Sequence, residues 1–548
     1  MRRVLPALIL TLLACQAVGL PLSRESPSPA SILVSPAPVA TTTPRPTFTV
    51  YFHPDGGLFV GDQVSLEVIA PPEFDLNQRE VKVQLGDEDG EVIASQGFAP
   101  YGLLERQQAT FYWAWDTRGF LPGSYTLFFS LVPEGPSWVQ AVFLNPQGDL
   151  PPPEPEAHWA MAESACCQVF YLTHTAAERD LPQLLATLDA QAEQVVAQLG
   201  LEFSEPIQIT FLSRVLGHGG FAAQEIAISY LDRNYASSDT AQVVHHEMVH
   251  RLDAIWGGDL KPTILAEGLA VYLSGGHFKP EPLIRRAAAL LDLGWYIPLR
   301  TLADAFYPSQ HEIGYLQAGA LVAFMVEQWG WEKFEDLYQD IHRQASGKPS
   351  DALEEALIRH LGITLEELED RLLAYLRRQP IIPDLGQDVY FTVAYYEVVR
   401  QYQQAYDPSA YFLTAWLVDG KTLREKGIVA DVLRHPMQPE NLVIETLLVS
   451  ADEHLRAGQY EEVEHLLDAV KAVMRALDKG DTDPFSVYPL AQAYARLIQG
   501  MLACGYEPQR IELSNQSGQV WGIAAWPQMR VIPVVMKRGS WILLGGCP

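Results

Sequence analysis

The segment Asp239–Gly257 constrains the fold of this chain more than any other stretch of its sequence. Asp239 precedes apolar residues at helical spacing and Gln242 follows it by three positions, which is the pattern of a helix capping box. Within the predicted helix, His246 and His250 stand four residues apart, and four steps of about 100° bring both imidazoles to one face. Two imidazoles at this spacing can bind one zinc ion.

Glu247 stands next to the first of these histidines, one step further round the predicted helix. From there its carboxylate can reach a water molecule on the metal rather than the metal itself, as in the His-Glu-x-x-His motif of zincins. The rest of the helix carries apolar side chains that a core can bury: Val243, Val244, Met248, Val249 and Leu252. The alternative is a surface helix with incidental histidines, and the capped, amphipathic context argues against it.

The next predicted helix, Pro262–Leu273, supplies a candidate for a third ligand. A catalytic zinc site has three protein ligands and one open position. Glu267 is the single carboxylate in this otherwise apolar helix, and burying its charge is costly unless it is paired or bound to a metal. The alternative is a solvent-facing glutamate. We also expect the small residues Gly268 and Ala270 to let this helix approach the histidine helix closely.

With these two motifs, residues 165–345 resemble the gluzincin metallopeptidases, specifically the peptidase MA-like group of the thermolysin and aminopeptidase-N clan. In that clan a glutamate on the helix after His-Glu-x-x-His completes the site, commonly within Glu-Gly-x-Ala, which here is Glu267–Ala270. The interval of 17 residues from His250 to Glu267 is somewhat shorter than the aminopeptidase-type interval.

The resemblance implies a zinc metallopeptidase in which His246, His250 and Glu267 bind Zn²⁺. Glu247 would take a proton from water and pass it to the leaving amine. Tyr315, on a downstream helix, would donate its hydroxyl to the oxyanion, although a tyrosine packed in the core fits the sequence equally well.

The kind of activity is an expectation of the same resemblance. The sequence contains no Gly-x-Met-Glu-Asn stretch, the exopeptidase motif of the aminopeptidase-N family, so we expect an endopeptidase acting on a peptide or protein substrate. The rival hypothesis is a non-catalytic, surface-anchored binding protein with a structural or vestigial zinc site.

Four features near the motif carry weaker expectations. Ala223–Tyr230 is predicted to be the edge strand on which an extended substrate lies, and the glycines of Gly217–Gly220 suit a flexible loop beside it or an ordinary turn. His245 points about 100° away from His246 and is predicted to support the site or lie on the surface. Asp253 is predicted to be a solvated residue near the helix end, with an orienting role toward an imidazole as the alternative.

Residues 1–21 are predicted to form an export signal. Two arginines precede an apolar run, Val4–Ala14, that is too short to span a bilayer. The run ends in Leu12–Cys15, which resembles the lipobox of bacterial lipoproteins and implies a lipid on Cys15 that anchors the protein to the outer face of a membrane. Ordinary secretion is the alternative. Residues 22–47 are a Pro-rich tether.

At 548 residues, the chain is too long for one hydrophobic core and is predicted to be multidomain. Short β-branched strands between turn clusters predict an all-β, immunoglobulin-like sandwich over 48–148, expected to be a spacer or binding platform. Residues 158–380 are predicted to form an α+β, zincin-like metallopeptidase domain. Residues 381–548 are predicted to be mainly helical, with a helical hairpin in Leu447–Leu477 and a few closing strands, one held at a sheet edge by Pro533.

The net charge bears on the class of binding partner, and the cysteine positions bear on metal sites and disulfides. The charge sum, 38 basic minus 67 acidic residues, is −29, and such an acidic surface repels phosphate backbones, so nucleic acid is not expected as a partner. Cys166, Cys167, Cys504 and Cys547 match no zinc-ribbon or redox motif. Bridges from the adjacent pair to the C-terminal cysteines and buried free thiols are both compatible with their positions.

Overall fold

The computed structural model describes residues 47–506 except 73, 237–238 and 381, together with the backbone of strands at 508–513, 519–524, 530–537 and 540–543. The predicted export signal, Cys15 and nearly all of the predicted tether lie outside the described residues. Thr47 begins a single compact unit that runs to the end of the chain.

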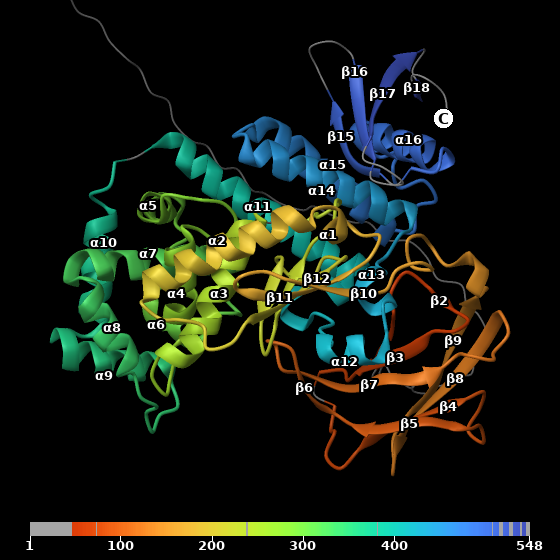
Figure 1. The fold of residues 1–548 in the computed structure, drawn as a ribbon, viewed down its shortest axis with the longest axis horizontal. Helices are drawn as coiled ribbons and strands as arrows, with labels where there is room; N and C mark the ends of the chain where they lie inside the picture. The colour runs from red at the N-terminus through yellow and green to blue at the C-terminus, as the bar shows by residue number, and fades with distance from the viewer. Residues whose placement is uncertain are drawn as a thin grey trace, which may run out of the picture. The chain divides into compact units, whose positions relative to one another are not determined.

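The N-terminal part of this unit is rich in strands, as the sequence predicted (Figure 1). Its two sheets have the strand orders β1-β3-β7-β6 and β2-β9-β8-β4-β5, and their inward faces share one apolar core. Leu127, Phe129 and Leu131 show the period-two burial that places alternate side chains of β8 in this core. The immunoglobulin-like type stays a prediction. The strands are β1 (Thr49–His53), β2 (Leu58–Phe59), β3 (Gln63–Ile69), β4 (Glu80–Leu85), β5 (Val92–Gly97), β6 (Ala99–Tyr101), β7 (Arg106–Asp116), β8 (Gly123–Val132) and β9 (Ser137–Asn145).

A mixed sheet with the order β10-β11-β12-β14-β13 follows. Its strands are β10 (Trp159–Glu163), β11 (Cys167–Leu172), β12 (Ile207–Leu212), β13 (Gly220–Ala222) and β14 (Ile226–Ser229). β11, β12 and β14 run parallel, and β10 and β13 pair antiparallel at the two edges. The prediction of Ala223–Tyr230 as an edge strand was therefore wrong, because the buried Ile226 and Ile228 place β14 between two neighbours. The edge is β13.

Helices supply the rest of the middle region, and the core that they share with the mixed sheet contains the helices of both motifs. They are α1 (Ala176–Arg179), α2 (Leu181–Leu199), α3 (Thr240–Trp256), α4 (Thr263–Ser274), α5 (Leu283–Leu293), α6 (Leu299–Asp304), α7 (His311–Trp329), α8 (Trp331–Gln339), α9 (Pro349–Leu361), α10 (Leu365–Leu376) and α11 (Pro383–Tyr406). Among the described residues, no helix combines the length and the apolar character that crossing a membrane requires.

The C-terminal part is mainly helical, as predicted, and ends in an antiparallel sheet. Its helices are α12 (Gly420–Lys426), α13 (Ala430–Leu433), α14 (Pro439–Arg456), α15 (Tyr460–Asp478) and α16 (Pro489–Ala503), and its strands are β15 (Pro508–Leu513), β16 (Gln519–Ala524), β17 (Arg530–Lys537) and β18 (Ser540–Leu543). The predicted hairpin is formed by α14 and α15. Pro533 does not mark an edge strand, because β17 pairs with both β16 and β18. Within the described residues, the pairing of β17 with β18 runs from Val534 to Lys537.

Cys166 and Cys167 form a disulfide with each other rather than with the C-terminal cysteines. The bridge joins adjacent residues at the start of β11. Cys547 lies outside the described residues.

Candidate metal centre and cleft

The helix that carries the first motif begins where the sequence predicts. The Asp239 side chain caps α3 by accepting hydrogen bonds from the backbone N–H groups of Ala241 (3.0 Å) and Gln242 (3.2 Å). The Gln242 amide instead donates to the carbonyl of Ser274 at 3.4 Å, so the return half of the capping box is not formed. This contact joins the first turn of α3 to the last residue of α4. The Gln242 side chain therefore helps to position the two motif helices relative to each other.

Three side chains from these two helices converge on one point. Nε2 of His246 lies 3.1 Å from Nε2 of His250, and Oε2 of Glu267 lies 3.3 Å from the first nitrogen and 3.2 Å from the second. A zinc ion bound tetrahedrally at about 2.0–2.1 Å holds its ligand atoms roughly 3.3–3.4 Å apart. The observed triangle therefore has the dimensions that zinc coordination requires.

The charges around this triangle favour a cation at its centre. Oε2 of Glu267 is buried and accepts no hydrogen bond from any described residue. Burial would raise the pKa of Glu267, but the two neighbouring imidazoles hold it well below its usual range. Burial would likewise lower the pKa of His250, and the Glu267 carboxylate outweighs this and raises it to about 9. A buried carboxylate oxygen aimed at two imidazole nitrogens fits a divalent metal ion.

Tyr307 holds the other oxygen of the carboxylate. Its hydroxyl donates a 2.8 Å hydrogen bond to Oε1 of Glu267. The sequence did not identify this residue, because Tyr307 stands between α6 and α7 with no motif around it. A carboxylate oriented on one oxygen by a hydrogen bond and free on the other is a common arrangement around bound metals.

Glu247 lies beside the three candidate ligands and lines the same cavity. Burial raises the pKa of its carboxyl group, and the two imidazoles only partly oppose this. The edge strand β13 packs directly against it, since a Cβ added to Gly220 would lie 3.0 Å from Oε1 of Glu247. Glu247 is therefore held between the candidate metal ligands and the backbone of an edge strand.

Tyr315 also lines the cavity and is buried. Its ring stacks on His277 at 4.0 Å between centroids, and its centroid lies 4.3 Å from that of His311. Burial, reinforced by the nearby Glu267 carboxylate, raises the pKa of Tyr315 well above its usual range, so the hydroxyl stays protonated at neutral pH. A protonated hydroxyl in the cleft can donate a hydrogen bond, and its role toward an oxyanion stays a prediction.

The small residue Gly268 of α4 faces α7 rather than α3. A Cβ added to Gly268 would lie 2.5 Å from the carbonyl oxygen of Ala318 on α7. A Cβ added to Gly319 would lie 2.5 Å from Cγ1 of Val271 on α4. The expectation that Gly268 brings the two motif helices together was therefore wrong. The small residue instead brings α4 against the helix that carries Tyr315.

A second cluster of histidines lies in the same cavity. The rings of His218 and His311 stack at 4.2 Å, and no described residue hydrogen-bonds to any of their four ring nitrogens. The neighbouring Glu312 is gripped by Arg400 through two contacts of 2.6 and 2.7 Å. Because this carboxylate is already paired, the cluster has no free anionic ligand, and its imidazoles are hydrogen-bonding groups of the cavity wall.

Two other predictions near the motif have clear outcomes. His245 is buried, and its ring nitrogens lie 2.9 Å and 2.8 Å from the amide oxygens of Gln191 and Gln198, so it fixes α3 to α2. Asp253 is buried and pairs with Lys261 at 3.5 Å. Its prediction as a solvated residue was wrong, because Asp253 lies on the buried face of the last turn of α3, whereas Ile255 on the same turn is exposed.

The candidate ligands open into a cavity of about 420 Å³. The two motif helices contribute Val243, His246, Glu247, His250 and Glu267. β13 contributes Gly220, Phe221 and Ala222. The remaining walls come from the histidine cluster, from Tyr307 and Tyr315, and from two segments outside the middle region, Tyr101–Leu103 and 412–417. A cavity of this size next to a metal centre can hold several residues of a peptide.

Comparisons with known proteins add little to this geometry. No family model matches the chain, and no curated protein matches it. Among solved structures, it is similar to the crystal structure of an aminopeptidase N family protein from Idiomarina loihiensis, with 11% sequence identity over 62% of this chain and 78% of that chain. The TM-score is 0.27. A likeness at this level carries no argument about activity, which rests on the residues of the cleft.

Proposed function

We propose that this chain is a zinc-dependent endopeptidase of the gluzincin type. The observation that carries the proposal is the triangle formed by His246, His250 and Glu267, whose sides of 3.1–3.3 Å surround a point next to an open cavity. The buried Oε2 of Glu267, aimed at both imidazole nitrogens, supports a metal ion at that point. Three protein ligands beside open space are the arrangement of catalytic rather than structural zinc sites.

Different residues of the cleft serve different steps of peptide hydrolysis. A zinc ion held by the triangle would lower the pKa of a water molecule and polarise the scissile carbonyl group. Glu247 accepts the proton of the attacking water and delivers it to the leaving nitrogen, and a carboxyl group whose pKa is raised by burial suits such an exchange. Tyr315 donates a hydrogen bond to the oxyanion.

The edge strand gives the substrate a place to lie. Within the described residues, β13 pairs only with β14, and its residues line the cleft. Its outer edge can therefore hydrogen-bond to an extended peptide, which would add a strand to the sheet. Such binding recognises the backbone of the substrate rather than a chain end. It therefore suits cleavage within a chain.

Export completes the proposal. The lipobox-like segment ending at Cys15 supports a protein anchored outside the cell membrane by a lipid, or secreted if that cysteine is not acylated. Labelling of growing cells with a palmitate analogue should mark the parent and not Cys15→Ser. The variant should also leave the membrane fraction.

The rival is a non-catalytic binding protein with a structural or vestigial zinc site. A structural site does not need a general base, and Glu247 is nevertheless held beside the candidate ligands in the cavity. This position favours catalysis.

The deciding experiment measures zinc content and cleavage of a denatured protein mixture for the parent and Glu247→Gln. We expect one zinc ion in both proteins, with the rate in the variant lower by about 10²–10⁴. Glu163→Gln, which alters an exposed glutamate on β10, serves as the control and should keep parental activity. Equal rates in the parent and Glu247→Gln would remove Glu247 from the mechanism, and zinc without activity in any of the proteins would favour the rival.

A further inference from the structure

One wall of the cavity is built by segments far outside the motif region. Tyr101, Gly102 and Leu103, at the hairpin between β6 and β7, come from the strand-rich N-terminal part. Residues 407–417 lie against this hairpin. This segment follows α11, has no long helix or strand, and is called the strap here. Its contributions to the cavity are Phe412, Ala415 and Leu417.

The hairpin is fixed to the backbone of the strap. The N–H of Leu103 donates to the carbonyl of Leu413 at 2.8 Å, and the Tyr101 hydroxyl donates to the carbonyl of Ala415 at 2.9 Å. Between these contacts Gly102 adopts φ +68°, and a Cβ added there would lie 2.3 Å from the Leu413 carbonyl oxygen. Only glycine permits both this conformation and this approach.

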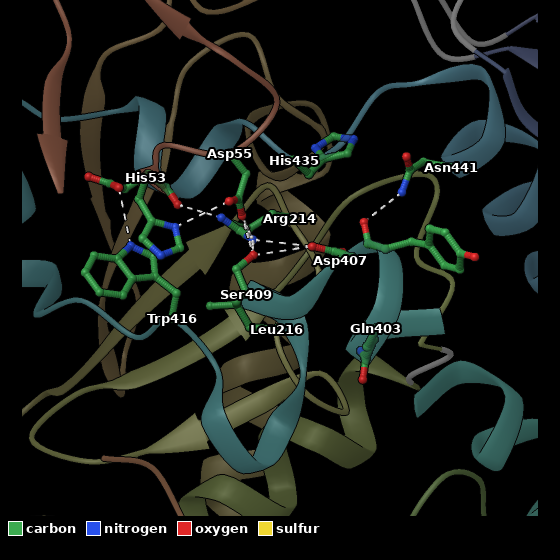
Figure 2. Close-up of polar contacts among 12 residues, drawn as sticks. His53, Asp55, Arg214, Leu216, Gln403, Asp407, Ser409, Trp416, His435 and Asn441 are labelled. Atoms are coloured by element: carbon green, nitrogen blue, oxygen red, sulfur yellow. Dashed lines mark hydrogen bonds and ion pairs between the residues drawn. The ribbon is translucent and has the colours of Figure 1, made fainter. Parts of the chain in front are cut away.

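The strap is also held from its other side by a buried polar network (Figure 2). Arg214 pairs with Asp55, just after β1, at 2.8 Å and contacts the Ser409 hydroxyl, which in turn donates to Asp55. Further along the strap, the Trp416 ring stacks on His53 with 4.0 Å between centroids and 5° between planes. Both ends of the strap are therefore locked to the N-terminal part, and the wall that it forms is a fixed part of the cleft.

The side chains of this wall are apolar. Leu103 and Leu417 are 43% and 37% exposed and present apolar surface to the cavity that they line. Phe221 on β13 and Phe412 lie together, since a Cβ added to Gly217 would be 2.8 Å from the first ring and 3.0 Å from Cβ of the second. The carboxylates that line the cavity, those of Glu247 and Glu267, are at the metal centre. The wall therefore offers a charged substrate side chain no counter-charge.

We propose that Leu103, Phe221, Phe412 and Leu417 form a subsite for a bulky apolar side chain of the substrate, of the size of leucine or phenylalanine, near the scissile bond. The inference rests on the proposed peptidase function and specifies its substrate class. It assigns to the N-terminal strand-rich part a direct share in substrate recognition.

A binding experiment tests the subsite independently of turnover. The affinities of acetohydroxamate and 4-phenylbutanohydroxamate for the zinc-loaded full-length protein are measured by calorimetry, because the two probes share a zinc-binding group and differ in an apolar side chain. We expect the larger probe to bind the parent at least about tenfold more tightly. Leu103→Lys should reduce this ratio to about twofold or less, because an ammonium group would then stand in the subsite.

Leu104→Lys is the matched control. Leu104 stands in the same turn, is 47% exposed and does not line the cavity, so its substitution should leave the ratio unchanged. Since both leucines are partly exposed, neither variant should lose thermal stability. Equal binding of the two probes to the parent, or the same ratio in both variants, would overturn the subsite and leave the zinc site standing. Failure of both probes to bind the parent would overturn the metal centre and the subsite with it.

Discussion

Tyr307 and Glu267 are joined by a 2.8 Å hydrogen bond from the tyrosine hydroxyl to Oε1 of the carboxylate. Oε2, the opposite oxygen, faces His246 and His250. The tyrosine therefore sets the rotation of the carboxylate and, with it, the direction of the oxygen available to a metal ion.

Replacing this tyrosine should weaken metal binding. Tyr307→Phe removes the orienting hydrogen bond, and we expect zinc affinity to fall by about 10–100-fold in competition with a chromogenic chelator. Tyr375→Phe removes a hydroxyl that donates to Glu327 and does not line the cavity, and it should leave zinc affinity unchanged. If both variants lost the same amount of affinity, Tyr307 would have no special part in positioning the ligand.

The packing of α4 on α7 gives a second prediction. Gly268→Ala would place a methyl group 2.5 Å from the Ala318 carbonyl, so we expect a loss of about 1–3 kcal/mol in the free energy of unfolding and weaker zinc binding. Gly386→Ala is the control, because that helical glycine has open space around its missing Cβ. Urea denaturation should show the control to be neutral or slightly stabilised.

The docking of the hairpin on the strap can be tested at Gly102. Gly102→Ala and Gly119→Ala both place an alanine at positive φ, but only the first creates a clash, with the Leu413 carbonyl. The difference between the two variants in thermal stability therefore isolates the clash from the backbone strain. We expect Gly102→Ala to be the less stable variant and to lose the preference for the larger hydroxamate.

Zinc itself should stabilise the folded protein. If zinc is present at 1,000 times its dissociation constant, the ligation adds about 4 kcal/mol to the free energy of unfolding. Removing it with EDTA should therefore lower the Tm measured by calorimetry, and added zinc should restore it. His246→Ala should show a much smaller response to either treatment. An unchanged Tm of the parent after EDTA treatment would contradict the metal site.

The network around the strap predicts a dependence of stability on alkaline pH. Burial alone would lower the pKa of His53, but Asp55 and Glu67 raise it to about 9. A histidine with a raised pKa stabilises the fold fully below pH of about 6.5 and loses that contribution as the pH rises through about 9. The loss is on the order of 3 kcal/mol.

Thermal unfolding at pH 6 and pH 10 checks this expectation. The parent should lose more stability over this interval than His53→Gln, in which the position cannot be protonated. His465→Gln alters an exposed imidazole on α15 and should follow the parent. An identical pH dependence of the parent and His53→Gln would show that the imidazole is neutral in the folded protein at both pH values.

The candidate ligands could be predicted because their geometry is local. Helical spacing alone sets His246 and His250 side by side, and the cost of burying a charge singled out Glu267. Tyr307 gave no such signal, because it stands between two helices and meets its partner 40 residues away. The contact of Tyr101 with Ala415 spans 314 residues, and no periodic pattern connects them.

The predictions that failed depended on what surrounds an element. The small residue Gly268 indicated close packing, but the sequence could not show which helix it faces. An aspartate near the end of a helix is typical of a solvent-exposed position. Asp253 is buried because of how the helices pack around it, which the sequence does not show. Pro533 excludes one hydrogen bond rather than a whole neighbouring strand, and β17 pairs with both β16 and β18.

The strap has a practical consequence for anyone who shortens this protein. A fragment limited to residues 158–380 would keep His246, His250 and Glu267 and could still take up zinc. It would keep Phe221 and lack the hairpin and the strap that carry Leu103, Phe412 and Leu417, leaving the cleft open to water on that side. If the proposed function holds, such a fragment should act slowly and with little selectivity, and weak activity in it would say little about the intact protein.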